Sequence, residues 1–517
     1  MVRIQTISLE DWKPGDCVVH NHPYKGASHS PDIAVVMPVF HKGELVGFSA
    51  NTAHHVDIGA ATPGLIIDVP DMWAEGMLMD AVKLYEGGSR VESLWKYIRD
   101  NTRVPGLVMG DLEAQIASAE LGVKRFEELL EKYGKDDVIA SCNQLMDYTE
   151  KLMRREIAKI PDGEYFAEGF LDDDGRNREK TLPIKVCVKV KGDDIEIDLT
   201  GSSDQVPTAF NVPFDGSTMV AAFFVFRAML LDTYTLEEYV PQNEGSFRPI
   251  KVTAPKGSIY NPIAPAAAEA RFCQIQRMAD LVIKALSPVI PEKSTAGNAA
   301  TLSFAAFSGV RPSGDYWVFL EVNEAATGGR PASDGVDTVE ELMRNTRNNP
   351  LEDLGMHLPL ICDRYEIRDD GPPGAGKFRG GAGVVKSQRY LTPGFMTHES
   401  DRHLDAPWGA FGGKPGSVGK MEIYNVKDRS NVRQEYSKFS GLRTEEGDVV
   451  SYISPSGGGF GNPLERAPAK VLDDVLDDII TIESARDDYG VVMREVDDGY
   501  GWAVNEQATE KLRREMS

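Results

Sequence analysis

The sequence is poor in cysteine and has no long hydrophobic run. Its five cysteines lie far apart and form no Cys-x-x-Cys pair, so a disulfide framework is not expected in a chain of 517 residues. Reduced thiols and a cytoplasmic location fit this usage. No apolar stretch reaches the roughly 20 residues that cross a bilayer. Residues 1–16 contain no hydrophobic core of a secretory signal.

Positive charge and nucleophile motifs are also scarce. Lys and Arg total 56 against 80 Asp and Glu, which gives a net charge of −24. This balance argues against nucleic acid or an anionic membrane as the partner, because both attract basic proteins. No Gly-x-Ser-x-Gly elbow occurs. Covalent catalysis is therefore not the favoured mechanism.

The composition that remains is that of a folded protein, with 41% hydrophobic and 26% charged residues. Alternating apolar residues at 32–40 and 44–55 predict two strands of a hairpin, and 184–201 predict a second hairpin. Helical spacing of apolar residues predicts helices over 111–133, 136–158, 215–231 and 272–287. From about residue 370 glycine becomes dense and helical periodicity disappears, until short charged helices return over 464–517.

These patterns predict an α+β protein with several domains. Residues 1–110 are expected to form a β-rich region with a His/Asp metal site. Residues 111–370 are expected to form a mixed α/β central region that contains most of the helices. Residues 371–517 are expected to form a Gly-rich, irregular β domain that ends in short helices.

Histidine is concentrated near the start of the chain. Six of the nine histidines lie between residues 20 and 55, interleaved with Asp16, Asp32 and Asp57. One reading is a set of polar turn residues and hydrogen-bonded core histidines. The density of the cluster favours a functional site instead. His41 is the exception, because it falls at the expected hairpin turn and is interpreted as a surface residue. The six histidines are His20, His22, His29, His41, His54 and His55.

The spacing within this cluster suits a metal. Imidazole and carboxylate groups are common ligands of zinc, manganese and ferrous iron. The predicted hairpin brings Asp32 near His54, and strand alternation sends His54 and His55 to opposite faces. At most one of that pair is then expected to be a ligand, and the other could orient a substrate or move a proton. A set of two histidines and one carboxylate leaves open coordination positions, as catalytic sites do.

Two glycine-rich stretches resemble nucleotide-binding loops but lack their context. Residues 371–377 match Gly-x-x-x-x-Gly-Lys, yet Phe378 follows where Ser or Thr is required, and no helix is predicted there. A series of β-turns is expected instead, with Gly376, Gly380 and Gly381 suited to them. The stretch 456–461 also lacks a strand–helix setting. ATP, if it is used, is expected to bind on another chain.

Further polar residues could hold a carboxylate or phosphate group. An ordinary hydrogen-bonded loop explains them equally well. They are Arg330, Asn345, Arg347 and Asn348, with Asn211 and the pair Arg402-His403 as weaker cases.

Several segments resemble those of hydantoinase B proteins, in the same order along nearly the whole chain. His29-Ser30-Pro31-Asp32 is similar to their histidine–x–proline–aspartate motif, and 53–59 are similar to their Ala-His-His-x-Asp-Ile-Gly. His22 departs from the pattern, because an aspartate is usual there. The further similar segments are 110–115, 211–213, 328–331, 345–348, 378–381, 408–413 and 457–461.

The resemblance implies a B-type subunit of an ATP-dependent complex. An A-type, actin-like ATPase subunit would bind ATP and magnesium and phosphorylate a carbonyl oxygen or bicarbonate. In this chain the resemblance assigns a divalent metal, zinc, manganese or iron, to His29, Asp32 and His54. The candidate catalytic residues are His20, His55 and Asp57. Most relatives carry a segment before Gly15-Asp16, which is either missing here or supplied by a small separate subunit.

Three functions are consistent with this resemblance. The first is carboxylation of an aromatic ketone of the acetophenone type with bicarbonate, which the shortened N-terminus favours. The second is ATP-dependent hydrolysis of a cyclic amide, such as an N-methylhydantoin or 5-oxoproline. The third is a scaffold subunit without chemistry of its own.

Overall fold

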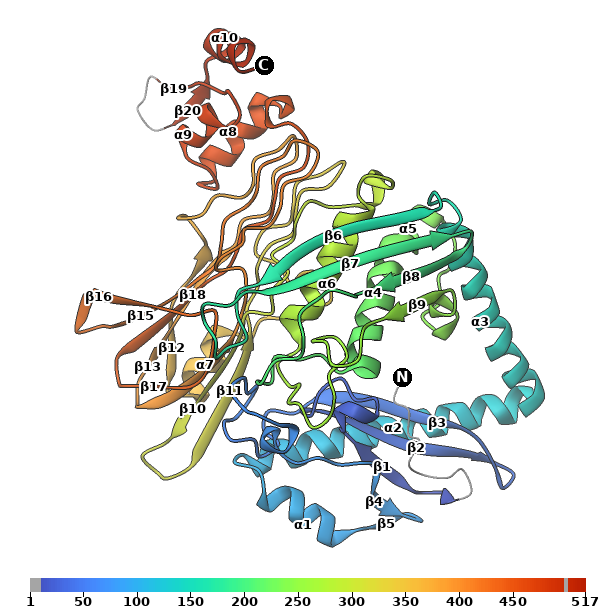
Figure 1. Ribbon diagram of the computed structural model, residues 1–517. Helices are drawn as coiled ribbons and strands as arrows, with labels where there is room; N and C mark the ends of the chain where they lie inside the picture. Colours follow the sequence, from blue (N-terminus) through green and yellow to red (C-terminus); the bar gives the residue numbers. More distant parts are fainter. Residues whose placement is uncertain (1–10, 497–500) are drawn as a thin grey trace.

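The computed structural model describes residues 11–496 and 501–517. Figure 1 shows an N-terminal sheet with two helices, a central sheet backed by helices, a pair of sheets built from later strands, and a small helical unit at the C-terminal end. The chain is α+β, as the sequence predicts. No helix in this described part combines the length and the apolar character that a membrane span needs.

The N-terminal sheet is antiparallel, with strand order β3-β2-β1-β4-β5. Ile33 and Val35 on β2 pack against Leu112 and Ile116 on helix α2, and this apolar contact holds the β2–β3 hairpin in place. The sequence prediction of this hairpin is confirmed. The elements are β1 (Cys17–His20), β2 (Asp32–His41), β3 (Glu44–His54), β4 (Val82–Glu86), β5 (Ser89–Arg90), α1 (Glu92–Asp100) and α2 (Pro105–Tyr133).

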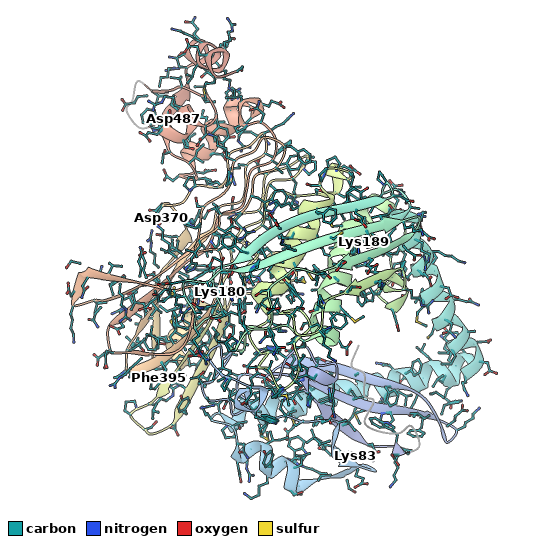
Figure 2. The ribbon with its side chains drawn as sticks, viewed as in Figure 1. Lys83, Lys180, Lys189, Asp370, Phe395 and Asp487 are labelled. Atoms are coloured by element: carbon teal, nitrogen blue, oxygen red, sulfur yellow. The ribbon has the colours of Figure 1, made fainter. Side chains whose placement is uncertain are left out.

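The central sheet has the order β6-β7-β8-β9, with β8 and β9 parallel. Buried and more exposed residues alternate along β7, so Ile184 and Val186 face the core while Lys189, labelled in Figure 2, faces outward. Lys189 pairs with Asp198 on β8 at 2.8 Å. Helix α6 packs against β6 and β7. The elements are α3 (Lys135–Ile157), β6 (Gly163–Leu171), β7 (Leu182–Lys191), β8 (Asp194–Asp198), α4 (Met219–Leu230), α5 (Thr233–Leu236), β9 (Ile250–Thr253) and α6 (Phe272–Leu286).

Two further sheets share one apolar core. Phe307 and Trp317 from the first sheet pack with Tyr390, Met421 and Val450, and most of these residues are almost fully buried. The first sheet has the order β11-β10-β14-β17 and the second β12-β13-β18-β15-β16. The elements are β10 (Phe304–Val310), β11 (Tyr316–Val322), α7 (Leu351–His357), β12 (Leu360–Ile367), β13 (Val384–Tyr390), β14 (Gly394–Glu399), β15 (Lys420–Asn425), β16 (Asp428–Glu435), β17 (Lys438–Thr444) and β18 (Asp448–Ile453).

Glycine-rich segments form an extended bundle between this pair of sheets and the C-terminal helices (Figure 1). Backbone hydrogen bonds join neighbouring segments, including Gly458 N to Gly297 O at 2.9 Å and Gly374 N to Gly457 O at 2.8 Å. A Cβ on Gly380 would lie 1.9 Å from Gly457 O, so side chains are excluded there. The expected series of β-turns is not found at Gly380 and Gly381. Neighbouring backbones lie against these two glycines and against Gly376 instead.

The C-terminal residues form short helices, as predicted, with one small hairpin. Arg466 links this unit to the bundle through Asp474 at 2.7 Å and Asp334 at 2.6 Å. The elements are α8 (Pro468–Leu476), α9 (Ile482–Asp487), β19 (Met493–Glu495), β20 (Trp502–Val504) and α10 (Glu506–Met516).

The expected regions 1–110, 111–370 and 371–517 stay a prediction, although elements of the structure cross both boundaries. Residue 110 lies inside α2, and strand β10 pairs with strand β14 across residue 370. Local periodicity cannot show such pairings, because it carries no information about which distant strands become neighbours.

Candidate functional site

The candidate metal ligands meet where the β2–β3 hairpin opens. Asp32 begins β2, His54 ends β3, and the two are direct partners in the strand register. The hairpin turns through Lys42 and Gly43, whose φ values are 51° and 84°. Such a two-residue turn fixes the register of both strands. A bulge between the Val39–Gly47 and Phe40–Leu45 pairs shifts this register by one residue. The turn and the bulge together therefore place Asp32 opposite His54 at the other end of the hairpin.

His29 reaches the same point from the segment before β2. Its Nε2 lies 3.3 Å from Asp32 Oδ1, and its ring centroid lies 5.0 Å from that of His54. One ligand atom from each of His29, Asp32 and His54 lies within 4.8 Å of the others. The structure therefore brings together the three residues that the resemblance selected.

Contacts behind the site orient its ligands. His29 Nδ1 lies 2.9 Å from Glu269 O, so Nδ1 carries the proton and donates it to the carbonyl. The buried His29 Nε2, which has no hydrogen-bond partner among the described residues, is left with its lone pair facing Asp32 and His54. Arg271 donates to Asp32 Oδ2 at 3.2 Å, and Ser28 Oγ donates to the same oxygen.

The surroundings favour the protonation states that bind a cation. Burial lowers the pKa of His29. Desolvation at the cavity wall and the neighbouring His29 lower the pKa of His54 to about 3. Burial by itself raises the pKa of Asp32, but the contacts with His29 and Arg271 outweigh it and hold that pKa well below its usual range. Two neutral imidazoles and one carboxylate result, which are the forms that ligate metals.

The three residues line a cavity of about 520 Å³. His54 is open to this cavity, whereas His29 is almost fully buried. Apolar side chains form much of the wall and a polar loop forms another part of it, a composition typical of small-molecule sites. The apolar residues include Phe272, Leu302, Phe304, Leu320, Val322 and Met343. The polar loop comprises Asn345, Thr346, Arg347, Asn348 and Asn349.

His55 does not line this cavity. Its side chain is almost fully buried, and its Nε2 lies 2.9 Å from Gln115 Oε1 on α2. Gln115 in turn donates to Ile33 O at 2.9 Å and to Asn51 Oδ1 at 3.0 Å. These bonds tie the end of β3 to the helix behind it.

The other candidate catalytic residues are also buried away from this cavity. Asp57 accepts hydrogen bonds from Arg103 NH1 at 2.8 Å and from Gly59 N at 3.1 Å. His20 lies 3.8 Å from Asp80. The structure thus does not bring His20 or Asp57 to the site.

His41 was wrongly interpreted as a surface residue. It is the last residue of β2 and is buried, with Nδ1 lying 3.4 Å from Glu131 on α2. The turn begins one residue later, so His41 packs under the helix instead of facing solvent. His22 caps a short helical turn, where its Nδ1 accepts a hydrogen bond from Tyr24 N.

Some of the other predicted polar residues line the cavity, and the rest lie elsewhere in the fold. Asn345, Arg347 and Asn348 line the cavity, whereas Arg330 lies elsewhere and donates to Asp334 O at 3.1 Å. Asn211 is buried and bonds only to backbone groups in the contacts described; they are Val206 N, Val206 O, Thr208 O and Ala267 O.

The pair Arg402-His403 lies in a buried ionic network. Arg402 pairs with Asp280 and Asp405, each at 2.9 Å, and His403 N donates to Asp172. These contacts account for Arg402 without a ligand, whereas the buried Nε2 of His403 has no hydrogen-bond partner among the described residues.

Sequence reasoning missed Arg271, which lies immediately before α6 and is separated from Asp32 by 239 positions. No local signal marks it. The apolar residues of the cavity wall could not be predicted either, since apolar residues on strands usually indicate an ordinary core.

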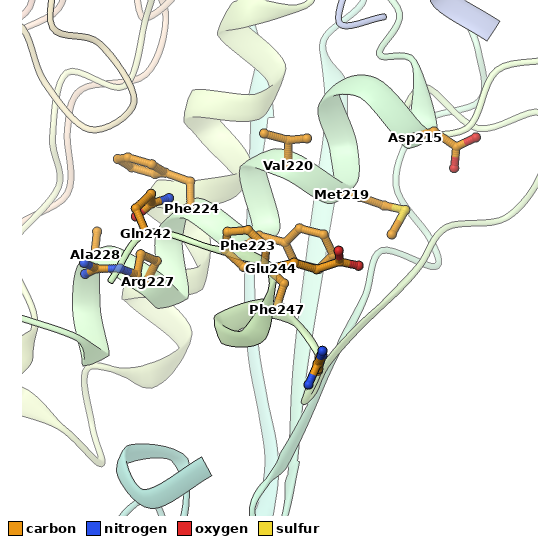
Figure 3. A pocket seen from close by; sticks show the side chains of 11 residues that line it. Asp215, Met219, Val220, Phe223, Phe224, Arg227, Ala228, Gln242, Glu244 and Phe247 are labelled. Carbon is orange, nitrogen blue, oxygen red and sulfur yellow. The ribbon is translucent and has the colours of Figure 1, made fainter. Parts of the chain in front are cut away.

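A second cavity of about 690 Å³ lies along α4 (Figure 3). Phe223 and Phe247 stack there with ring centroids 4.8 Å apart. No group of three potential metal ligands was found in it among the described residues. The smaller cavity beside His54 is therefore the better candidate for chemistry.

Comparison with known proteins agrees with the sequence resemblance. A family model described as hydantoinase B/oxoprolinase matches residues 1–463. A protein from Pseudomonas sp. strain NS671 that is named as a D-/L-hydantoinase subunit is 44% identical over 512 residues, which covers 98% of this chain and 85% of that protein.

Two solved structures are similar in fold. The ATP-dependent caprolactamase from Pseudomonas jessenii matches with a TM-score of 0.87 at 27% identity, over 98% of this chain and 86% of that chain. Nucleotide-free acetone carboxylase matches with a TM-score of 0.85 at 20% identity, over 97% and 72% of the two chains, and this shows the fold alone. The family-model match and the 44% identical relative show that the chain belongs to the hydantoinase B/oxoprolinase family of enzymes.

Proposed function

We propose that the chain is the B-type catalytic subunit of an ATP-dependent cyclic-amide hydrolase. The observation that carries the proposal is the set of His29, Asp32 and His54 at the wall of a largely apolar cavity. Relatives named hydantoinase and caprolactamase support a hydantoin or lactam as the substrate class.

The three residues fit a divalent cation. The Nε2 atom of His29 is buried without a hydrogen-bond partner among the described residues, so its lone pair is free to bind a cation. Arg271 keeps Asp32 ionised. When bound, zinc, manganese or iron would supply Lewis acidity and a water of lowered pKa.

The remaining residues act by binding and orientation. Arg271 fixes the Asp32 carboxylate, and Glu269 O keeps the proton of His29 on Nδ1. Phe272 and Phe304 provide an apolar wall that excludes water from a bound ring. The amides of the polar loop offer hydrogen bonds to the ring's polar edge.

The ATP-using step is assigned to a partner. Relatives are named as subunits, and the stretch 371–377 lies in the glycine bundle, where Lys377 pairs with Glu465 at 3.1 Å. An A-type, actin-like ATPase subunit that binds ATP and magnesium would phosphorylate the amide, and this chain would bind the activated ring. A small additional subunit is compatible with this assembly.

Carboxylation of an aromatic ketone with bicarbonate is the second candidate. The aromatic side chains of Phe272 and Phe304 in the cavity wall favour it, because they could pack against an aryl ring. The two candidates need different co-substrates, and this difference makes them separable by experiment.

The test is ATP turnover by the complex purified with its natural partner chains. A hydrolase turns over ATP with a hydantoin or lactam and needs no bicarbonate, while a ketone carboxylase needs both ketone and bicarbonate. His54→Ala is expected to lower product formation at least about a hundredfold. His357→Ala is the matched control, because His357 is exposed and pairs only with Asp353 at 3.3 Å in the described part of the chain. Full activity of His54→Ala would indicate a scaffold subunit.

A further inference from the structure

Arg347 is a charged side chain of the cavity to which the proposed chemistry assigns no task. It lies in the polar loop that lines the same cavity as His54, and it is exposed. Among the residues that the structure describes, no ion pair or hydrogen bond of its guanidinium is found. The other cations around the cavity differ from it in this respect.

Arg271 and Arg344 also line the cavity, but both are committed to protein partners. Arg271 donates to Asp32 at 3.2 Å. Arg344 is buried, donates to Asn323 O at 3.1 Å, and lies 3.3 Å from Glu340 and 3.6 Å from Glu341. Their charges are therefore balanced within the protein.

The acidic groups of the cavity are equally committed. Asp32 faces Arg271 and the two histidines. Glu321 pairs with the buried Lys386 at 2.6 Å. Among the described residues, no carboxylate in the cavity wall is left to neutralise Arg347, so its charge is available to a ligand.

The neighbouring amides complete a site for oxygen atoms. Asn348 Nδ2 donates to Tyr365 OH at 2.5 Å, and Tyr365 OH donates to Glu324 at 3.0 Å. This chain of bonds orients Asn348 beside Arg347. The planar guanidinium can bind two oxygens of a phosphate or carboxylate, and asparagine amides add neutral donors.

We infer that Arg347, with Asn345 and Asn348, forms an oxyanion-binding subsite in the cavity that His54 also lines. The ligand is either the phosphate of an ATP-activated intermediate or a carboxylate carried by the substrate. The inference rests on the proposed function only for the origin of that anion. The subsite itself follows from the unpaired guanidinium and the committed charges around it.

Binding of inorganic phosphate to the purified full chain, measured by calorimetry without added metal, tests the subsite directly. Arg347→Ala is expected to weaken phosphate binding at least about tenfold, since hydrogen bonds to charged groups are the strong ones. Arg347→Lys should recover part of the affinity because it keeps the charge. Arg330→Ala is the matched control, an exposed arginine outside the cavity. Unchanged affinity in Arg347→Ala, or an equal loss in Arg330→Ala, would overturn the inference.

Turnover by the assembled complex then separates the two sources of the anion. If the anion is phosphate, Arg347→Ala lowers turnover of a neutral lactam and of a carboxylate-bearing lactam alike. If it is a substrate carboxylate, only the second substrate is affected, through a raised KM. Unchanged turnover of both would contradict a role in the reaction. Failure of the wild-type complex on every lactam would refute the proposed function while leaving the phosphate measurement valid.

Discussion

His54 and His55 follow one another in the chain but contribute to different parts of the molecule. His54 opens into the cavity with His29 and Asp32, while His55 is buried against Gln115. The alternation of a β-strand separates them. Substitutions of these two residues therefore test different properties, metal binding for His54 and packing for His55.

Glu75 links protein stability to pH. Its carboxyl is fully buried, and burial raises its pKa to about 8; Glu75 Oε1 accepts hydrogen bonds from Ala268 N at 2.5 Å and Glu269 N at 2.7 Å. In the unfolded chain the pKa is about 4.3. The folded state thus favours the protonated acid. Its stabilising contribution is complete below about pH 4 and is lost as the pH rises towards 8.

Glu75→Gln is expected to remove this contribution to the pH dependence. Between about pH 5 and pH 8, the Tm of the wild type should fall by more than the Tm of Glu75→Gln, because the glutamine side chain does not titrate in this range. Thermal unfolding across that range measures the difference. Parallel curves for the two proteins would show that Glu75 does not titrate as inferred.

Sequence reasoning located the candidate ligands but not the residues that support them. The predicted hairpin brought Asp32 and His54 near each other, but their exact pairing depends on a bulge next to Val39 that the alternation of residues does not reveal. The contact between Arg271 and Asp32 could not be predicted, because it depends on how α6 packs beside the N-terminal sheet. His20 and Asp57 were expected at the site for their residue type, yet Asp57 is engaged by Arg103.

At the scale of elements, the glycine bundle is the least predictable part of the fold. Its composition indicated turns, because glycine is most familiar there. The structure uses glycine for close contact between backbones instead. Local sequence patterns do not show which segments lie together, since the segments around residues 297, 374 and 458 are joined by long-range hydrogen bonds.

Gly380→Ala is expected to destabilise the protein by several kcal/mol, on the order of 3 or more, because the new Cβ would lie 1.9 Å from Gly457 O. Gly110→Ala is the matched control. Gly110 lies in α2, and no described atom lies within 4 Å of the position that an added methyl group would take, so the change should be neutral or stabilising by about 0.5–1 kcal/mol. Urea unfolding of both variants measures the contrast. Equal stabilities would contradict close packing of the bundle.

At the scale of the whole molecule, the α+β class and most elements were predictable from the sequence, whereas the pairing of distant strands was not. Helices α2, α3, α4 and α6 appear where apolar periodicity placed them. Their assembly depends on strands such as β10 and β14, which pair across about ninety positions of sequence. The family resemblance supplied what local patterns could not, namely which three of the clustered residues lie together.

The central claim is that His29, Asp32 and His54 bind a divalent cation. Elemental analysis of the purified complex tests it most directly, with His54→Ala and His357→Ala prepared in the same way. The wild type and His357→Ala should each carry about one equivalent of zinc, manganese or iron per chain, and His54→Ala should carry almost none. An unchanged metal content in His54→Ala would contradict the account.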